Sequence, residues 1–234
     1  VVIPDGVAVI GNDAFSYCES LKSIIIPDSV TSIGESAFEG CSSLTTLVLP
    51  DSVTSIRNSS FWGCSSLASL VIPDGVTSIG NGAFADCSSL KNLVLPESVV
   101  SIKGNLFCKW NGEVKCLSPN FIFEDGVLFN KDKSTIISFR DKDMTSYVIP
   151  DYVTSIGGDA FSGCESLTSL VIPDSVVSIG DGAFSHCESL KNIVLPNSIT
   201  SIGFCVFQHC RSLKSLVIPD SVTSIDTLAF CFCS

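Results

Sequence analysis

A proline recurs every 23 residues along most of this 234-residue chain, and no other feature constrains the fold as strongly. The spacing is broken once, by a gap of 31 residues, and then resumes. The ten prolines of the chain are Pro4, Pro27, Pro50, Pro73, Pro96, Pro119, Pro150, Pro173, Pro196 and Pro219. A fixed period of about 20 to 30 residues is typical of a solenoid, in which each repeat forms one coil and stacks on the next.

The run before each proline predicts a β-strand. In residues 167–172 apolar and polar side chains alternate, and many of the apolar ones in this column are β-branched. Leu170 and Ile172 are expected to face the core, and Val171 to face away from it. The Pro-Asp-Ser that follows predicts a turn, because proline presets φ and aspartate can bond its own backbone.

A glycine follows the Ser-Ile of most repeats. We expect Gly180, in this column, to supply a backbone conformation with positive φ. Three repeats carry another residue there, so the requirement is not absolute: Arg57, Lys103 and Asp226.

One phenylalanine per repeat follows in an Ala-Phe or related pair. The column consists of Phe15, Phe38, Phe61, Phe84, Phe107, Phe161, Phe184, Phe207 and Phe230. A single coil could not bury such a ring alone, whereas stacked coils bury it between them. The column therefore predicts a continuous aromatic spine.

The repeat pattern Leu-x-x-Leu-x-Ile-Pro-x-x-Val-x-x-Ile-Gly-x-x-Ala-Phe-x-x-Cys resembles the BspA-like leucine-rich repeats, also called the Treponema pallidum type. The resemblance implies a β-rich solenoid, a right-handed curved coil with a parallel sheet on its concave face. It places a second short strand near Thr-Ser-Ile and a turn or 3₁₀ segment near Ala-Phe. Family members are often surface proteins that bind host matrix or other cells, so it also implies an extracellular or cell-surface location.

The pattern is interrupted in the middle of the chain. We expect a single repeat domain over 1–234, with a first array at 1–107, a degenerate coil plus insert at 108–147, and a second array at 148–234. The insert predicts a β-hairpin with residues 130–133 at its tip. It is interpreted as a structural join between the arrays, with a protruding recognition element as the alternative. Because the chain begins and ends within a repeat, we expect it to be part of a longer protein.

Eight of the twelve cysteines share one column: Cys18, Cys41, Cys64, Cys87, Cys164, Cys187, Cys210 and Cys233. Stacked coils hold parallel side chains about 4.8 Å apart, which is longer than the Cβ separation of about 3.8 Å that a disulfide prefers. We interpret the column as buried free thiols. Disulfides remain an alternative, above all at four cysteines outside the column: Cys108, Cys116, Cys205 and Cys231.

No metal, cofactor or catalytic site is expected. His186 and His209 precede column cysteines and could form a zinc site with them, although surface histidines beside buried thiols are the simpler interpretation. The acidic residue after most prolines could form a calcium row, but turn formation explains it equally well. A catalytic site needs a specific group in one place, and here almost every polar residue follows the repeat. We therefore do not expect an enzyme.

The candidate binding residues are the outward-facing column of the strand before proline. They are Ile25, Val48, Val71, Val94, Leu117, Val148, Val171, Val194 and Val217. Small polar residues flank them at Ser23, Thr46, Ser69, Asn92, Ser146, Ser169, Asn192 and Ser215. A long exposed apolar stripe is typical of a binding surface, although valine also simply suits a strand.

These features favour a non-catalytic interaction or adhesion module that binds a protein or glycan through the exposed sheet face. The alternatives are a self-assembling structural repeat protein, in a filament or surface layer, and an intracellular scaffold. Ice binding by the threonine column is a remote alternative, since valines interrupt that column. The net charge of −11 argues against nucleic acid, and no apolar run approaches the roughly 18 residues of a membrane span.

Overall fold

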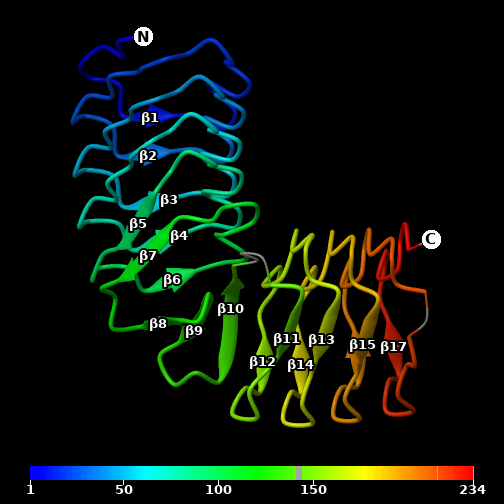
Figure 1. Cartoon of the computed structure of the whole chain (residues 1–234). Helices are drawn as coiled ribbons and strands as arrows, with labels where there is room; N and C mark the ends of the chain where they lie inside the picture. The colour runs from blue at the N-terminus through cyan, green and yellow to red at the C-terminus, as the bar shows by residue number, and fades with distance from the viewer. Residues whose placement is uncertain (141–143, 215, 234) are drawn as a thin grey trace. The chain divides into compact units, whose positions relative to one another are not determined.

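The computed structural model describes residues 1–140, 144–214 and 216–233 of the chain (Figure 1). The chain divides into two compact units, Val1–Phe123 and Glu124–Ser234. The boundary falls within residues 108–147, the segment that interrupts the repeats; that the two arrays form one domain stays a prediction. The described residues contain strands and turns but no helix, and so none that could cross a membrane.

Within each unit the chain winds into stacked coils whose equivalent strands pair in parallel (Figure 1). The predicted β-solenoid is confirmed. The second short strand falls on the Ser-Ile dipeptide of the repeats, and on Val9–Ile10 in the first coil, close to where the family resemblance places it. In the first unit these strands are β1 (Val9–Ile10), β2 (Ser32–Ile33), β3 (Ser55–Ile56), β4 (Ser78–Ile79) and β6 (Ser101–Ile102). In the second they are β12 (Ser155–Ile156), β14 (Ser178–Ile179), β16 (Ser201–Ile202) and β17 (Ser224–Ile225).

The strands before the prolines form the other parallel ladder. They are β5 (Asn92–Leu95) and β7 (Glu113–Cys116) in the first unit, and β11 (Ser146–Val148), β13 (Ser169–Val171) and β15 (Asn192–Val194) in the second. Earlier coils of the first unit make single bridges at the same place, such as Ser23 with Thr46. Leu170 and Ile172 are buried while Val171 is exposed, so the predicted alternation is confirmed.

The central insert contains β8 (Phe121–Glu124), β9 (Val127–Asn130) and β10 (Thr135–Phe139). Strands β9 and β10 are antiparallel, so the predicted hairpin is confirmed. On its other side β10 pairs in parallel with β12, where Ile136 lies opposite Ile156. Phe129, Ile136 and Phe139 are fully buried in the core of the second unit. The hairpin therefore acts as the first coil of the second array, which supports its structural interpretation.

The phenylalanine rings stack along each array. In the first unit the ring centroids of Phe15, Phe38, Phe61 and Phe84 follow one another at 5.4, 5.7 and 6.0 Å. In the second unit the stack begins one ring earlier than predicted, because Phe139 lies 4.6 Å from Phe161. It continues through Phe184, Phe207 and Phe230 at 5.5, 5.4 and 5.4 Å. The predicted spine is thus present within each unit.

The prediction for Gly180 is wrong, because its φ is not positive. Positive φ occurs instead in two other columns of the repeat. In most coils one of them is the second residue before the column phenylalanine, as at Ser36 and Gly182. The other is the second residue after each column phenylalanine, where φ lies between 55° and 72°. These residues are Tyr17, Gly40, Gly63, Asp86, Lys109, Gly163, His186, His209 and Phe232. Glycine occupies only three of them, which is why the sequence did not reveal the column.

Glycine is used after Ser-Ile because the preceding coil approaches closely. A Cβ atom on Gly80 would lie 2.4 Å from the backbone nitrogen of Asn58, and one on Gly180 would lie 2.4 Å from that of Gly158. The amide side chain of the coil below uses this space: Asn58 Oδ1 accepts a hydrogen bond from the backbone N–H of Asn81 at 3.0 Å. The glycine column is therefore a packing requirement between coils.

Replacing Gly80 with alanine is expected to lower the free energy of unfolding by about 1–3 kcal/mol, because the backbone must shift to relieve the clash. Chemical unfolding followed by circular dichroism measures this change. Gly11→Ala is the matched control, since a Cβ atom at Gly11 meets nothing within 4 Å. Equal stability of the two variants would contradict the packing explanation.

Candidate interaction surface

All nine residues of the predicted binding column have exposed side chains, from 40% for Val94 to 82% for Val217. In the first unit these are Ile25, Val48, Val71, Val94 and Leu117, and in the second Val148, Val171, Val194 and Val217. We call these residues the apolar row. Their exposure agrees with the sequence analysis, whereas their role in binding stays a prediction.

In the second unit the apolar row is set by the register of the parallel sheet. Val148 lies opposite Val171, which lies opposite Val194, each at the 23-residue spacing. Between them Leu170 and Ile193 point the other way and are almost completely buried. Burial of one face fixes the register, because a slip by one residue would move every apolar side chain to the wrong side.

In the first unit the predicted position of Leu117 needs correction. Val94 lies opposite Lys115, not Leu117, so the degenerate coil is two residues shorter than the repeat. Leu117 is 43% exposed but lies just after the end of β7 at Cys116, where its backbone N–H donates to the Leu95 carbonyl at 2.8 Å. In the same shortened coil Trp110 is buried and donates from Nε1 to the Leu90 carbonyl at 2.7 Å.

The small polar residues lie beside the apolar row as predicted in the first coils. Bridges connect Ser23 with Thr46 and Thr46 with Ser69. Asn92, Ser146, Ser169 and Asn192 each begin a strand in this ladder and are exposed or half-buried. Ser215 lies outside the described residues.

Two shallow hollows lie along the apolar row of the first unit. One, of about 320 Å³, is lined by Ile25 and Val48 together with their strand neighbours from residues 23–26 and 46–48. The other, of about 480 Å³, is lined by Asp74, Glu97, Ser98 and Leu117. The row thus runs from an apolar hollow in the early coils to an acidic one in the later coils.

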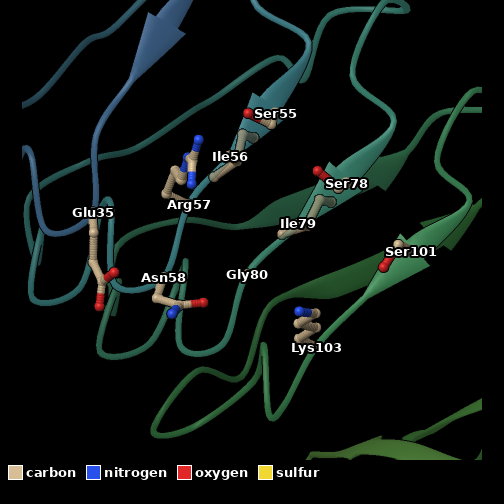
Figure 2. Close-up of a pocket in the computed structure, with 10 residues that line it drawn as sticks. All are labelled: Glu35, Ser55, Ile56, Arg57, Asn58, Ser78, Ile79, Gly80, Ser101 and Lys103. Atoms are coloured by element: carbon tan, nitrogen blue, oxygen red, sulfur yellow. The ribbon is translucent and has the colours of Figure 1, made fainter.

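A third hollow, of about 350 Å³, lies on the Ser-Ile strands of the first unit (Figure 2). We call it the serine hollow. Figure 2 shows Ser55, Ser78 and Ser101 on the successive strands β3, β4 and β6. The remaining lining residues are Glu35, Ile56, Arg57, Asn58, Ile79, Gly80 and Lys103. In the sequence Arg57 and Lys103 are visible only as exceptions to the glycine column, so this hollow was not predicted.

All twelve cysteines are free, and six of the eight column cysteines are buried. Cys18, in the first coil, is exposed and Cys233 is half-buried. Each thiol from the second coil of an array onward donates to the carbonyl of the phenylalanine 25 or 26 residues earlier. For Cys87 the acceptor is Phe61, at 3.0 Å, and for Cys210 it is Phe184, at 3.1 Å. The thiols therefore link neighbouring coils, a role that the sequence did not predict.

Burial raises the pKa of these thiols. It raises the pKa of Cys41 to about 11 and those of Cys87 and Cys210 to about 12. The pKa of Cys64 is raised further, with the neighbouring Cys87 and Cys41 adding to the effect of burial. Reactive cysteines have lowered pKa values, so this column is built for packing and not for nucleophilic chemistry.

The candidate metal ligands are not brought together. No group of three or more His, Cys, Asp or Glu side chains in the described parts of the chain could hold a metal ion. The rings of His186 and His209 stack at 4.4 Å, and that of His209 stacks on Phe232 at 4.5 Å. These histidines form a second ring stack apart from the phenylalanine spine.

Comparison with known proteins identifies the family. Residues 1–112 and 136–234 match the BspA type leucine rich repeat region, in six copies. The chain belongs to this family. The family match leaves out residues 113–135 of this BspA-type chain. These residues contain the end of the degenerate coil and most of the hairpin. A search of curated proteins found no match.

Solved structures of bacterial proteins share the fold. A leucine rich cell surface protein from Faecalibacterium prausnitzii is 34% identical, with a TM-score of 0.74, over 100% of this BspA-type chain and 70% of its own. The pneumococcal vaccine antigen PcpA is 26% identical, with a TM-score of 0.68, over 96% and 67%. A leucine-rich repeat protein from Bacteroides ovatus is 26% identical, with a TM-score of 0.52, over 100% and 84%. The three are described as a leucine rich cell surface protein, a vaccine antigen and a leucine-rich repeat protein.

Proposed function

We propose that this BspA-type chain is a non-catalytic interaction module of a cell-surface or secreted protein, binding a protein or glycan through the apolar row. The observation that carries the proposal is the exposure of every residue of the row, at the same position of successive coils in both units. Monomeric proteins rarely leave a long apolar patch uncovered unless it meets a partner. The description of the F. prausnitzii protein as a cell surface protein supports the location, and so does the description of the pneumococcal protein as a vaccine antigen.

The geometry favours an extended partner. In the second unit, Val148, Val171 and Val194 repeat at the coil spacing of about 4.8 Å, with no variation to select a compact ligand. A protein strand or a polysaccharide laid across the coils would meet the same valine at each step. This is a surface for adhesion by many weak, equal contacts.

The triple substitution Val71→Lys, Val94→Lys and Val171→Lys is expected to weaken binding to the chain's partner at least about tenfold, since each lysine places a hydrated charge in the apolar contact. The wild-type chain is first tested for saturable binding to immobilised matrix proteins and glycans, and the variant is then compared on each one that binds. Because all three valines are exposed, the variant is expected to fold normally.

The chain supplies a matched control. Val9, Val100 and Val177 are also exposed valines, distributed as two in the first unit and one in the second, but outside the apolar row. Their triple lysine variant carries the same added charge and should bind as the wild type does. Equal binding by both variants would remove the apolar row from the proposal, and no saturable binding by the wild type would count against adhesion.

The same row also favours a second candidate, self-assembly through paired rows of two copies. A row of equally spaced valines is complementary to another copy of itself. Sedimentation of the chain across a wide range of concentration distinguishes the candidates. Association that the row lysines abolish supports assembly, whereas a monomer at high concentration contradicts it.

A further inference from the structure

The serine hollow breaks the repeat symmetry of the chain. Its column holds glycine at Gly34 and Gly80, but Arg57 and Lys103 occupy the positions on either side of Gly80. In the second unit the same column is Gly157, Gly180, Gly203 and Asp226, with no cation. Repetition explains a residue found in every coil, whereas a pair of cations in one hollow needs a separate explanation.

Both cations of the serine hollow are available to a ligand. Among the described residues, neither Arg57 nor Lys103 makes an ion pair or a side-chain hydrogen bond, and both are exposed. Glu35 lines the same hollow but lies beyond ion-pair distance of either cation. Figure 2 shows Arg57 just after β3 and Lys103 just after β6, with the strand β4 between them.

The hydroxyl groups beside the cations are also unused. Ser55, Ser78 and Ser101 lie in register on neighbouring strands, and their hydroxyls bond to no described residue. In the second unit, by contrast, the equivalent Ser178 donates to Ser155 at 2.8 Å. The serine hollow therefore offers one free hydroxyl on each of three neighbouring coils, beside the free cations of the first and third of these coils.

From this arrangement we propose that the serine hollow binds an acidic polysaccharide that carries an anionic group on alternate sugars. Arg57 and Lys103 bind two successive anionic groups, and Ser55, Ser78 and Ser101 bond to sugar hydroxyls along the chain. The backbones of Arg57 and Lys103 lie two coils apart, which is about 10 Å at the strand spacing of about 4.8 Å. One pyranose ring with its glycosidic bond spans about one coil. Anionic groups on alternate sugars are therefore separated by about the same distance as the two cations.

The same spacing argues against an extended acidic peptide. Side chains on one face of an extended chain repeat every two residues, about 7 Å, which does not match a separation of about 10 Å. General attraction of polyanions is also excluded, because the chain has a net charge of −11. Binding of a polyanion must therefore come from a local group of cations, since charges further away than about 8 Å are screened at physiological salt.

This site does not depend on the apolar row. The serine hollow lies on strands β3, β4 and β6, whereas the row follows the strands before the prolines. Substitutions in one leave the other intact, so the two proposals can fail separately.

Binding of hyaluronan and chondroitin sulfate octasaccharides, measured by calorimetry on the full chain, tests the proposal. The double variant Arg57→Gln and Lys103→Gln is expected to bind at least about tenfold more weakly, and Glu35→Gln more tightly because a like charge at the hollow is removed. Raising the salt to about 1 M should weaken wild-type binding, since that shortens the screening length to about 3 Å. A neutral chitin octasaccharide should bind far more weakly than either acidic one.

Lys22→Gln and Lys91→Gln provide the control, because they remove the same charge from exposed positions outside the hollow. This control should bind as the wild type does, and circular dichroism should show that all variants fold. The proposal is overturned if neither acidic octasaccharide binds, if both double variants lose affinity equally, or if the neutral octasaccharide binds as well. Tighter binding of a poly-glutamate peptide than of either acidic octasaccharide would overturn the proposal in favour of an acidic protein segment.

Discussion

Replacing Phe184 with alanine is expected to lower the free energy of unfolding by about 3–5 kcal/mol. Its ring is fully buried between those of Phe161 and Phe207, at 5.5 and 5.4 Å. Truncation leaves a cavity that the stacked coils cannot close, because each coil is held to both neighbours by parallel backbone hydrogen bonds. Urea unfolding followed by circular dichroism measures the change.

Phe204→Ala is the control for this prediction, because that ring lies in the same unit but is 45% exposed. It should change the free energy of unfolding by less than about 1 kcal/mol, in the range of surface substitutions. A small loss at Phe184, or an equal loss at both positions, would show that the ring stack is not the main source of stability in the second unit.

The ring stack also shows what the sequence could predict. A 23-residue period with fixed columns determines which side chains face inward, because every coil must bury its apolar face against an identical neighbour. The burial of Leu170 and the exposure of Val171 follow from strand alternation alone. The hairpin was predictable too, from two apolar runs separated by polar residues.

The features that the sequence did not reveal are those where spacing departs from the period. Phe139 joins the ring stack 22 residues before Phe161, and Val94 pairs with Lys115 at a spacing of 21. Aligning on proline cannot detect such shifts, because it assumes that every coil pairs at the 23-residue spacing. The positive-φ column was hidden for another reason: Tyr17, His186 and other non-glycine residues adopt it where hydrogen bonds between coils hold the backbone.

The serine hollow shows the same limit for function. Arg57 and Lys103 are visible in the sequence as exceptions, but only the structure places them in one hollow beside three free hydroxyls. The apolar row, by contrast, was predictable because it repeats. Positions that repeat in every coil therefore determine the fold and form a general surface. Positions that depart from the repeat identify where the chain can select a ligand.

Raising the pH from about 8 to about 10.5 is expected to destabilise the protein steeply through its buried thiols. Burial raises the pKa of Cys87 and of Cys210 from an ordinary value of 9.0 to about 12. The unfolded chain therefore loses these protons first. The stability that each thiol contributes is complete below about pH 9 and is lost as the pH rises towards the folded-state pKa, at about 1.4 kcal/mol per pH unit.

Urea unfolding at several pH values measures this slope, and Cys87→Ser isolates the contribution of one thiol. Serine can still donate to the Phe61 carbonyl that accepts from Cys87 at 3.0 Å, but it does not ionise in this range. The variant should therefore show a slope that becomes shallower above pH 9, by up to about 1.4 kcal/mol per pH unit. Because lysine and tyrosine titrations are common to both proteins, they cancel in the comparison. Identical slopes would mean that the cysteine column is not sealed from solvent, and the interpretation of these thiols as the buried link between coils would fail.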